Sequence, residues 1–168
     1  DLSEDAIRHA RQRYAGPRVD FRVADAIRFE DPFGFDTVVS IETLEHVPDP
    51  RGLADRLVGL LRPAGTLVAS VPVTPSVDAN PHHLHAFTER SFRDLFEGHG
   101  LVEIDALAQR QPFSPFRVLA RSETRMQEVR PNLPGYYLRN PGALARRLGS
   151  TVRHGFANRY LTLVWRRG

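Results

Sequence analysis

An apolar run that ends in a cluster of acids and a histidine constrains this chain more than any other segment. The run Phe35-Asp-Thr-Val-Val-Ser-Ile41 has the composition of a β-strand, and its expected buried residues are Val38, Val39 and Ile41. The residues that follow it include Glu42, Glu45 and His46. Parallel strands of α/β sheets present ligand-binding groups at their carboxyl ends. The sequence therefore predicts a buried strand with a polar site at its end.

Strand and helix patterns alternate over residues 1–110. Ser3 is a good N-cap for a helix that reaches about Tyr14, and Thr88 is another N-cap. The other segments expected are strands at 19–23, 66–71 and 101–107, a helix at 51–61, and a last strand at 160–165. This order is typical of an α/β fold with a mostly parallel sheet and helices on both faces. We expect one domain, with a core at 1–110, a cap at 111–157 that includes two short helices, and a final core strand at 158–168.

The composition excludes several classes of protein. With 168 residues, 41% hydrophobic and 26% charged, the chain has the make-up of an ordinary globular domain. There is no cysteine, which excludes disulfides and thiolate metal sites and is compatible with a reducing cytoplasm. No apolar run approaches the roughly 20 residues of a membrane span, and no signal peptide heads the chain. We expect a cytoplasmic protein with no membrane partner.

The basic residues are all arginine, and they are spread along the chain with a modest enrichment from Arg139 to Arg167. The formal net charge is only +3. A nucleic-acid-binding protein usually concentrates its basic residues on one face. The spread of arginines favours a solvated surface over a nucleic-acid interface, and a small molecule is the preferred partner.

The order of motifs resembles the second half of a class I S-adenosylmethionine-dependent methyltransferase. The resemblance covers about residues 1–110 and the last strand, and it includes the run Leu60–Val71 after Phe35–Pro50. It implies a Rossmann-like fold with a late antiparallel strand inserted beside the sixth, and S-adenosylmethionine as the cofactor. The family's first strand and glycine-rich loop have no counterpart in these residues. We therefore expect an N-terminally truncated domain, and weak or no binding of S-adenosylmethionine by this chain alone.

The resemblance also implies a set of cofactor contacts. In the family an acid at the end of the second strand accepts hydrogen bonds from the ribose hydroxyls, and Asp1 stands at that place. The alternative for Asp1 is an acid stabilised by a helix dipole. Asp25 matches the residue that takes the adenine amino group, and its alternative is an Asx-turn. The cofactor-binding residues implied are Asp1, Leu2, Asp25, Ala26, Ser40 and Ile41.

Glu42, Glu45 and His46 have Glu-x-x-Glu-His spacing, which places all three on one face if the segment is helical. Ubiquinone-biosynthesis O-methyltransferases carry a similar element. Bacterial small-RNA 3′-terminal 2′-O-methyltransferases carry it too, with a further histidine that His83 matches best and His85 nearly as well. On that pattern Glu42, Glu45, His46 and His83 would hold a divalent cation such as Mg²⁺. The alternatives are His46 as a metal-free general base, and a structural role for the cluster.

The leading functional hypothesis is transfer of a methyl group from S-adenosylmethionine to an oxygen or nitrogen of a small molecule, with His46 as the catalytic residue. The alternative among enzymes is a metal-dependent RNA 2′-O-methyltransferase. The alternative from another class is a non-catalytic, truncated methyltransferase-like domain. A dehydrogenase is weaker, because the absence of lysine rules out a tyrosine-lysine pair. The acceptor and the oligomeric state are left open.

Overall fold

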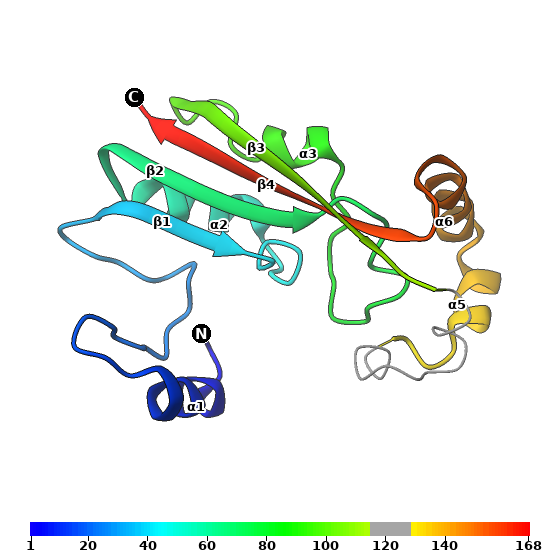
Figure 1. Cartoon of the computed structure of the whole chain (residues 1–168), viewed down its shortest axis with the longest axis horizontal. Coiled ribbons are helices and arrows are strands. Elements are labelled where there is room, and N and C mark those ends of the chain that lie inside the picture. Colours follow the sequence, from blue (N-terminus) through cyan, green and yellow to red (C-terminus); the bar gives the residue numbers. More distant parts are fainter. Residues whose placement is uncertain (115–128) are drawn as a thin grey trace.

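A four-stranded sheet forms the centre of the molecule in the computed structural model, which describes residues 1–114 and 129–168 (Figure 1). The strands are β1 (Phe35–Ile41), β2 (Leu61–Pro72), β3 (Leu101–Pro112) and β4 (Ala157–Arg167), in the spatial order β1-β2-β4-β3. β1 pairs parallel with β2, and β4 pairs antiparallel with both β2 and β3. Hence β1, β2 and β3 run in one direction and β4 runs against them. The predicted late antiparallel strand, inserted beside the preceding one, is confirmed.

Side chains cap the start of every described helix except the last. The helices are α1 (Glu4–Tyr14), α2 (Pro50–Gly59), α3 (Glu89–Asp94), α5 (Leu133–Arg139) and α6 (Pro141–His154). Ser3 accepts a hydrogen bond from the Ala6 amide at the start of α1. Thr88 and Ser91 form a reciprocal capping box at the start of α3. Because such side chains satisfy amides that lack a partner within the helix, both starts were predictable from sequence.

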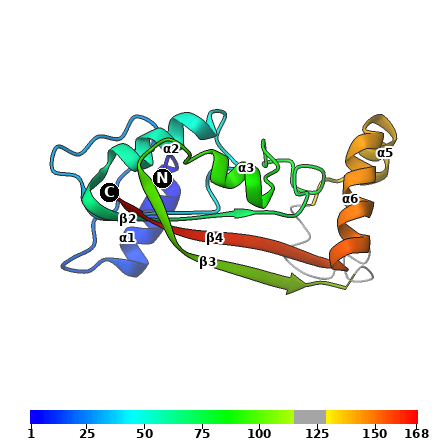
Figure 2. The ribbon, with the colours of Figure 1, turned by 90° about the horizontal axis from the view of Figure 1, so that it is seen from above.

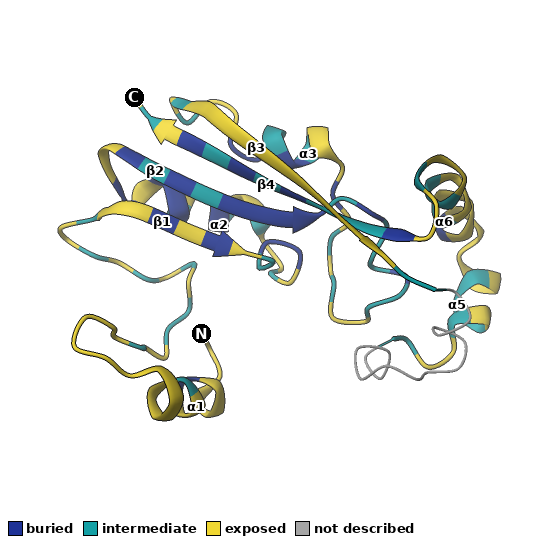
Figure 3. Cartoon of the chain, in the orientation of Figure 1, coloured by how far each residue is buried: buried dark blue, intermediate teal, exposed yellow. Residues whose placement is uncertain are grey.

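The hydrophobic core lies between one face of the sheet and the helices α2 and α3 (Figures 2 and 3). The sheet contributes Leu67, Ala69, Val71, Leu161, Leu163 and Trp165, and the helices contribute Leu53, Ala54, Leu57, Val58 and Phe92. β3 is exposed along almost its whole length. The predicted α/β class with flanking helices is confirmed, and α2 and α3 share one face of the sheet.

Burial along β1 alternates, which corrects one prediction. Val38 and Ser40 are buried, whereas Val39 is 59% exposed and Ile41 is 52% exposed. The strand bounds were predicted correctly, but Val39 and Ile41 were wrongly expected to be buried. Successive side chains of a strand point to opposite faces, so a sheet covered on one face buries only every second residue.

The expected strand at 19–23 is not formed. Among the described residues the segment makes only an isolated bridge between Gly16 and Val19. The Phe21 carbonyl, which a strand would pair with a neighbour, instead accepts from the side chain of Arg11. Val19 is 51% exposed, so this alternating pattern has no surface to pack against. Apolar alternation alone does not make a strand unless a partner strand is adjacent.

Different helices lie beyond the β1 edge of the sheet and beyond its carboxyl end. α1 lies past the β1 edge of the sheet, while α5 and α6 lie beyond the carboxyl ends of β1 and β2 (Figure 1). Two short helices were predicted within the cap at 111–157, and α5 and α6 lie in this segment. No helix in the described part of the chain is long and apolar enough to cross a membrane.

Candidate functional site

The chain leaves β1 through a turn rather than a helix. The Glu42 amide still pairs with the Ser70 carbonyl at 3.2 Å, as a strand residue would. Glu42 then adopts a left-handed φ of 50°, and the His46 amide closes a turn on the Thr43 carbonyl at 3.0 Å. The conditional expectation that the acids and the histidine share a helix face therefore does not apply. Because residues 42–46 form a turn, Glu42 does not share a helix face with Glu45 and His46.

Glu45 is completely buried and holds the histidine-rich segment in place. Its carbonyl oxygen accepts hydrogen bonds from the amides of Leu84 at 2.8 Å and His85 at 3.2 Å. The residue is 0% exposed, and neither carboxylate oxygen has a hydrogen-bond partner among residues 1–114 and 129–168. Burial disfavours the charged form and raises the pKa of Glu45 to about 7.

His46 and His83 face each other beside this carboxylate. Their ring centroids are 4.7 Å apart at 89°, and His46 Nε2 lies 3.9 Å from Glu45 Oε1. His46 Nδ1 is 3.0 Å from the His82 carbonyl oxygen. Because a carbonyl only accepts, Nδ1 carries the proton, and Nε2 of the neutral ring keeps its lone pair. His46 Nε2 is thus available as a base or as a metal ligand.

His83 is held as a neutral ring. Its Nδ1 is 2.8 Å from the hydroxyl oxygen of Ser76. Burial lowers the pKa of His83 to about 4, with further contributions from His46 and His82. His85, the rival position, instead places Nε2 3.0 Å from the Val47 carbonyl, and so anchors the loop backbone.

Three of the four predicted metal ligands come together. One ligand atom each from Glu45, His46 and His83 lies within 4.8 Å of the others. A carboxylate and two imidazoles suit a divalent cation, and the unpartnered oxygens of Glu45 fit a positive ion. Glu42 does not join this group, because its Oε1 accepts from the Ser70 hydroxyl at 2.7 Å. Burial raises the pKa of Glu42, and the Ser70 hydrogen bond opposes that rise.

The two predicted nucleotide-binding acids lie side by side. The Asp1 carbonyl accepts from the Ala24 amide at 3.0 Å, which brings Asp1 next to Asp25. Both side chains also make local contacts: Asp1 Oδ1 accepts from the Ser3 amide at 2.8 Å, and Asp25 Oδ1 accepts from the Ile27 amide at 3.0 Å, as in the Asx-turn named as its alternative. Their cofactor roles remain predictions.

The remaining predicted cofactor residues occupy varied environments. Leu2 and Ala26 are exposed beside the two aspartates. Ser40 is buried at 6% exposure, and Ile41 is exposed at the end of β1, next to the Glu45–His46–His83 cluster in sequence. Their roles are not tested by these positions and also remain predictions.

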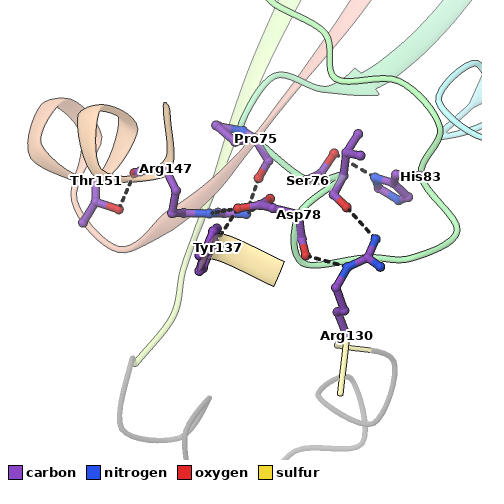
Figure 4. A network of polar contacts seen from close by, with 9 residues as sticks. Pro75, Ser76, Asp78, His83, Arg130, Tyr137, Arg147 and Thr151 are labelled. Atoms are coloured by element: carbon purple, nitrogen blue, oxygen red, sulfur yellow. Dashed lines mark hydrogen bonds and ion pairs between the residues drawn. The ribbon is translucent and has the colours of Figure 1, made fainter. Parts of the chain in front are cut away.

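Sequence reasoning missed a polar network that lies next to the histidines (Figure 4). Asp78, only 3% exposed, accepts hydrogen bonds from Arg147 on α6 and Tyr137 on α5. The pairs are 69 and 59 residues apart in sequence, so no local spacing could reveal them. A cavity of about 450 Å³ adjoins this network, lined by Val73, Pro75, Thr88, Glu89, Gly149, Ser150, Arg153, His154 and Arg159.

Comparisons with known proteins find several methyltransferases. Residues 1–69 match the family model described as a methyltransferase domain. An uncharacterized methyltransferase of Mycobacterium tuberculosis (strain ATCC 25618 / H37Rv) is 39% identical over 99 residues, which is 58% of this chain and 50% of that protein. The ubiquinone biosynthesis O-methyltransferase of Xanthomonas euvesicatoria pv. vesicatoria is 39% identical over 74 residues, 42% of this chain and 31% of that protein. The chain spans half or less of the length of these relatives.

Solved structures share the fold at low sequence identity. A candidate methyltransferase from Bacillus halodurans C-125 matches with a TM-score of 0.71 and 16% identity, over 99% of this chain and 80% of that one. The N-methyltransferase NodS from Bradyrhizobium japonicum WM9, solved with S-adenosyl-L-homocysteine, matches with a TM-score of 0.59 and 17% identity, over 99% of this chain and 64% of that one. These likenesses agree with the resemblance to class I S-adenosylmethionine-dependent methyltransferases: residues 1–69 match a methyltransferase domain, and the chain shares the fold of solved methyltransferases.

Proposed function

We propose that the protein transfers a methyl group from S-adenosylmethionine to an oxygen or nitrogen of a small molecule, with His46 as the general base. The observation that supports this role is the position of the His46 ring. It follows the carboxyl end of β1, its Nδ1 is held by a carbonyl, and its Nε2 lies 3.9 Å from Oε1 of the buried Glu45 and makes no hydrogen bond within residues 1–114 and 129–168. The names of the relatives, an O-methyltransferase and an N-methyltransferase, are compatible with either acceptor atom.

The cofactor, when bound, supplies an electrophilic methyl group, so the protein mainly orients the two reactants and accepts a proton. Asp1 and Asp25 would hold the ribose hydroxyls and the adenine amino group, because carboxylates accept hydrogen bonds from such donors. Ser40 and Ile41 would lie under the methionine part. The backbone hydrogen bond between Asp1 and Ala24 supports this assignment, since it brings the backbone of Asp1 next to that of Asp25.

The proton from the acceptor would pass to His46 Nε2. The imidazolium that forms keeps its Nδ1–H on the His82 carbonyl, 3.0 Å away, so the ring does not rotate as it is protonated. The Glu45 carboxyl group, 3.9 Å from Nε2, stabilises the positive ring when it is ionised. Removal of a general base usually lowers the rate about 10²- to 10⁴-fold.

A metal-assisted version is the second candidate. Glu45, His46 and His83 would hold a divalent cation, which lowers the pKa of a bound acceptor hydroxyl. The unpartnered carboxylate oxygens of Glu45 support this version. His46 would then be a ligand and not the base, so the two versions exclude each other. An RNA acceptor is not proposed, because none of the relatives named above is an RNA methyltransferase by name.

The test measures methyl transfer from S-adenosylmethionine, at millimolar concentration, to a catechol or a primary amine. His46→Gln should lower the rate at least 100-fold, while His9→Gln, on the exposed surface of α1, should leave it unchanged. A loss of activity with EDTA that Mg²⁺ restores would select the metal-assisted version. Unchanged rates in His46→Gln and with EDTA would overturn both versions, and no transfer by the unmodified chain would leave the non-catalytic alternative.

A further inference from the structure

In a short turn after β2, every backbone carbonyl oxygen accepts a hydrogen bond. Most of the donors come from residues far along the chain. We call residues 75–79 the linker turn. The Ser76 carbonyl is satisfied within the segment, by the amides of Ala79 and Asn80 at 3.1 and 2.8 Å. The other carbonyls are satisfied from outside. Buried carbonyls require partners, so the groups that supply them specify the conformation of the turn.

Arg130 and Arg147 are these outside partners (Figure 4). Arg147 Nη2 donates to the Pro75 carbonyl. Arg130 donates from Nη2 to the Val77 carbonyl at 3.2 Å, from Nε to the Asp78 carbonyl at 3.1 Å, and from its backbone amide to the Ala79 carbonyl at 2.8 Å. The segment from Arg130 through α6 therefore holds the turn from the side of the helix pair α5–α6.

Asp78 completes the attachment with its side chain. Its carboxylate accepts from Arg147 Nε at 2.8 Å and Nη2 at 2.6 Å, and from the Tyr137 hydroxyl at 2.6 Å. Burial opposes the charge of Asp78, but these donors outweigh burial and lower its pKa. The same pairing raises the pKa of Arg147, although burial opposes it. A bidentate arginine pair with a further hydroxyl donor is among the stronger polar contacts in proteins.

The linker turn reaches the candidate site through Ser76. The Ser76 hydroxyl is 2.8 Å from His83 Nδ1, and the His83 amide donates to the Asn80 carbonyl at 3.3 Å. Beyond His83, the amides of Leu84 and His85 dock on the Glu45 carbonyl. A continuous set of hydrogen bonds thus runs from the helix pair through the turn to the residues around Glu45.

We propose that Asp78 is a positioning residue: by docking the helix pair α5–α6 on the linker turn, it fixes Ser76 and thereby holds the His83 ring against His46. The part of His83 in catalysis rests on the proposed function, whereas its position does not. Docking of the helix pair and assembly of the histidine cluster are then a single event. A substrate that displaces α5 and α6 would loosen the cluster, and one that packs against them would order it.

The test compares Asp78→Asn with the unmodified 168-residue chain at one fixed pH. The first readout is hydrogen exchange at the Leu84 and His85 amides, which do not contact Asp78. Exchange there should become 10- to 100-fold faster in the variant. The second readout is the ¹⁵N spectrum of the His83 ring, which should change from one tautomer to an average of two. The matched control is Asp55→Asn, which removes an exposed acid paired with His99 on the other side of the core and should change neither readout.

Two further variants keep the test decisive if Asp78→Asn does not fold. Arg130→Gln removes the bonds to the Val77 and Asp78 carbonyls but leaves the Asp78–Arg147 pair, and it should also speed exchange at Leu84. Ser76→Ala should change the His83 spectrum with α6 still docked. Faster exchange in α6 with Leu84, His85 and His83 unchanged would overturn the proposal, because Asp78 would then hold only the helices. Absence of methyl transfer would overturn the proposed function while leaving these readouts as expected.

Discussion

Glu45 and Asp78 are both buried carboxylates, yet their surroundings are opposite. Glu45 is 0% exposed with no hydrogen-bond partner for its oxygens in the described part of the chain, and its pKa is raised to about 7 by burial. Asp78 is 3% exposed, and Arg147 and Tyr137 lower its pKa in spite of burial. Similar burial therefore produces shifts of opposite sign, and the partners decide which one occurs.

The comparison distinguishes Asp78, which stabilises the folded state, from Glu45, which destabilises it when charged. An unpaired buried carboxyl group destabilises the folded state whenever it is charged. A paired one stabilises the folded state relative to a chain in which either partner has been removed. Glu45 lies beside two histidines at the end of a strand, whereas Asp78 joins distant segments. The unpaired carboxyl group marks the candidate site, and the paired one supports it.

The largest effect is expected from Asp78→Ala. This change leaves the Arg147 guanidinium, 19% exposed, without its carboxylate partner. Breaking a buried ion pair in this way typically lowers the free energy of unfolding by about 3–5 kcal/mol. Urea denaturation at pH 7 measures the loss, and Asp55→Ala should change stability by only about 0.5 kcal/mol. A loss for Asp78→Ala no larger than that of the control would remove the distinction between the two carboxylates.

Acid should weaken the protein through Asp78. Its folded-state pKa is lower than its value in the unfolded chain, so its contribution is present above the unfolded pKa and is lost as the pH falls through the folded pKa. The loss is therefore expected below the ordinary range of an aspartate. Asp78→Asn should have a flatter stability profile in that acidic range than the unmodified chain, measured by denaturant titration at each pH. Parallel profiles would show that Asp78 is not paired in solution.

Glu45→Gln should change the free energy of unfolding in the opposite direction. The folded-state pKa of about 7 exceeds the ordinary 4.5, so the stability of the unmodified chain falls as the pH rises from about 4.5 to 7. Glutamine stays neutral, and the variant should therefore be more stable above pH 7 by on the order of 3 kcal/mol. The gain should vanish near pH 4.5, where Glu45 itself is neutral. A variant that is less stable at pH 8 would indicate that the carboxylate has a partner after all.

A smaller effect is expected from Ser70→Ala, which tests Glu42, a carboxylate whose pKa rise on burial is opposed by a hydrogen bond from Ser70. Ser70 donates to Glu42 at 2.7 Å, and that bond opposes the burial that raises the pKa of Glu42. Its removal should destabilise the protein by about 1 kcal/mol and raise the pKa of Glu42 further. NMR titration of the Glu42 carboxyl carbon measures the second change. A fall in that pKa would show that Ser70 does not donate to Glu42.

The correct predictions concern features whose causes are local. The bounds of β1, and the caps at Ser3 and Thr88, follow from neighbouring residues, and the structure agrees with them. The strand expected at 19–23 failed because a strand needs a neighbour, which its own residues do not specify. The spacing of Glu42, Glu45 and His46 indicated a site but not its members, because the left-handed turn at Glu42 directs its carboxylate to Ser70.

The sequence by itself determined the order of elements from β1 to β3, the capped helix starts at Ser3 and Thr88, and the presence of acids and histidines after β1. Only the tertiary structure decided that Glu42 pairs with Ser70 and does not join Glu45, His46 and His83, that Glu45 has no hydrogen-bond partner in the residues described, and that Asp78 pairs with Arg147. The physical reason is the distance along the sequence over which each interaction acts. Caps and strand composition act over a few residues, whereas the pKa of a buried carboxyl group depends on partners that the fold brings from distant parts of the chain.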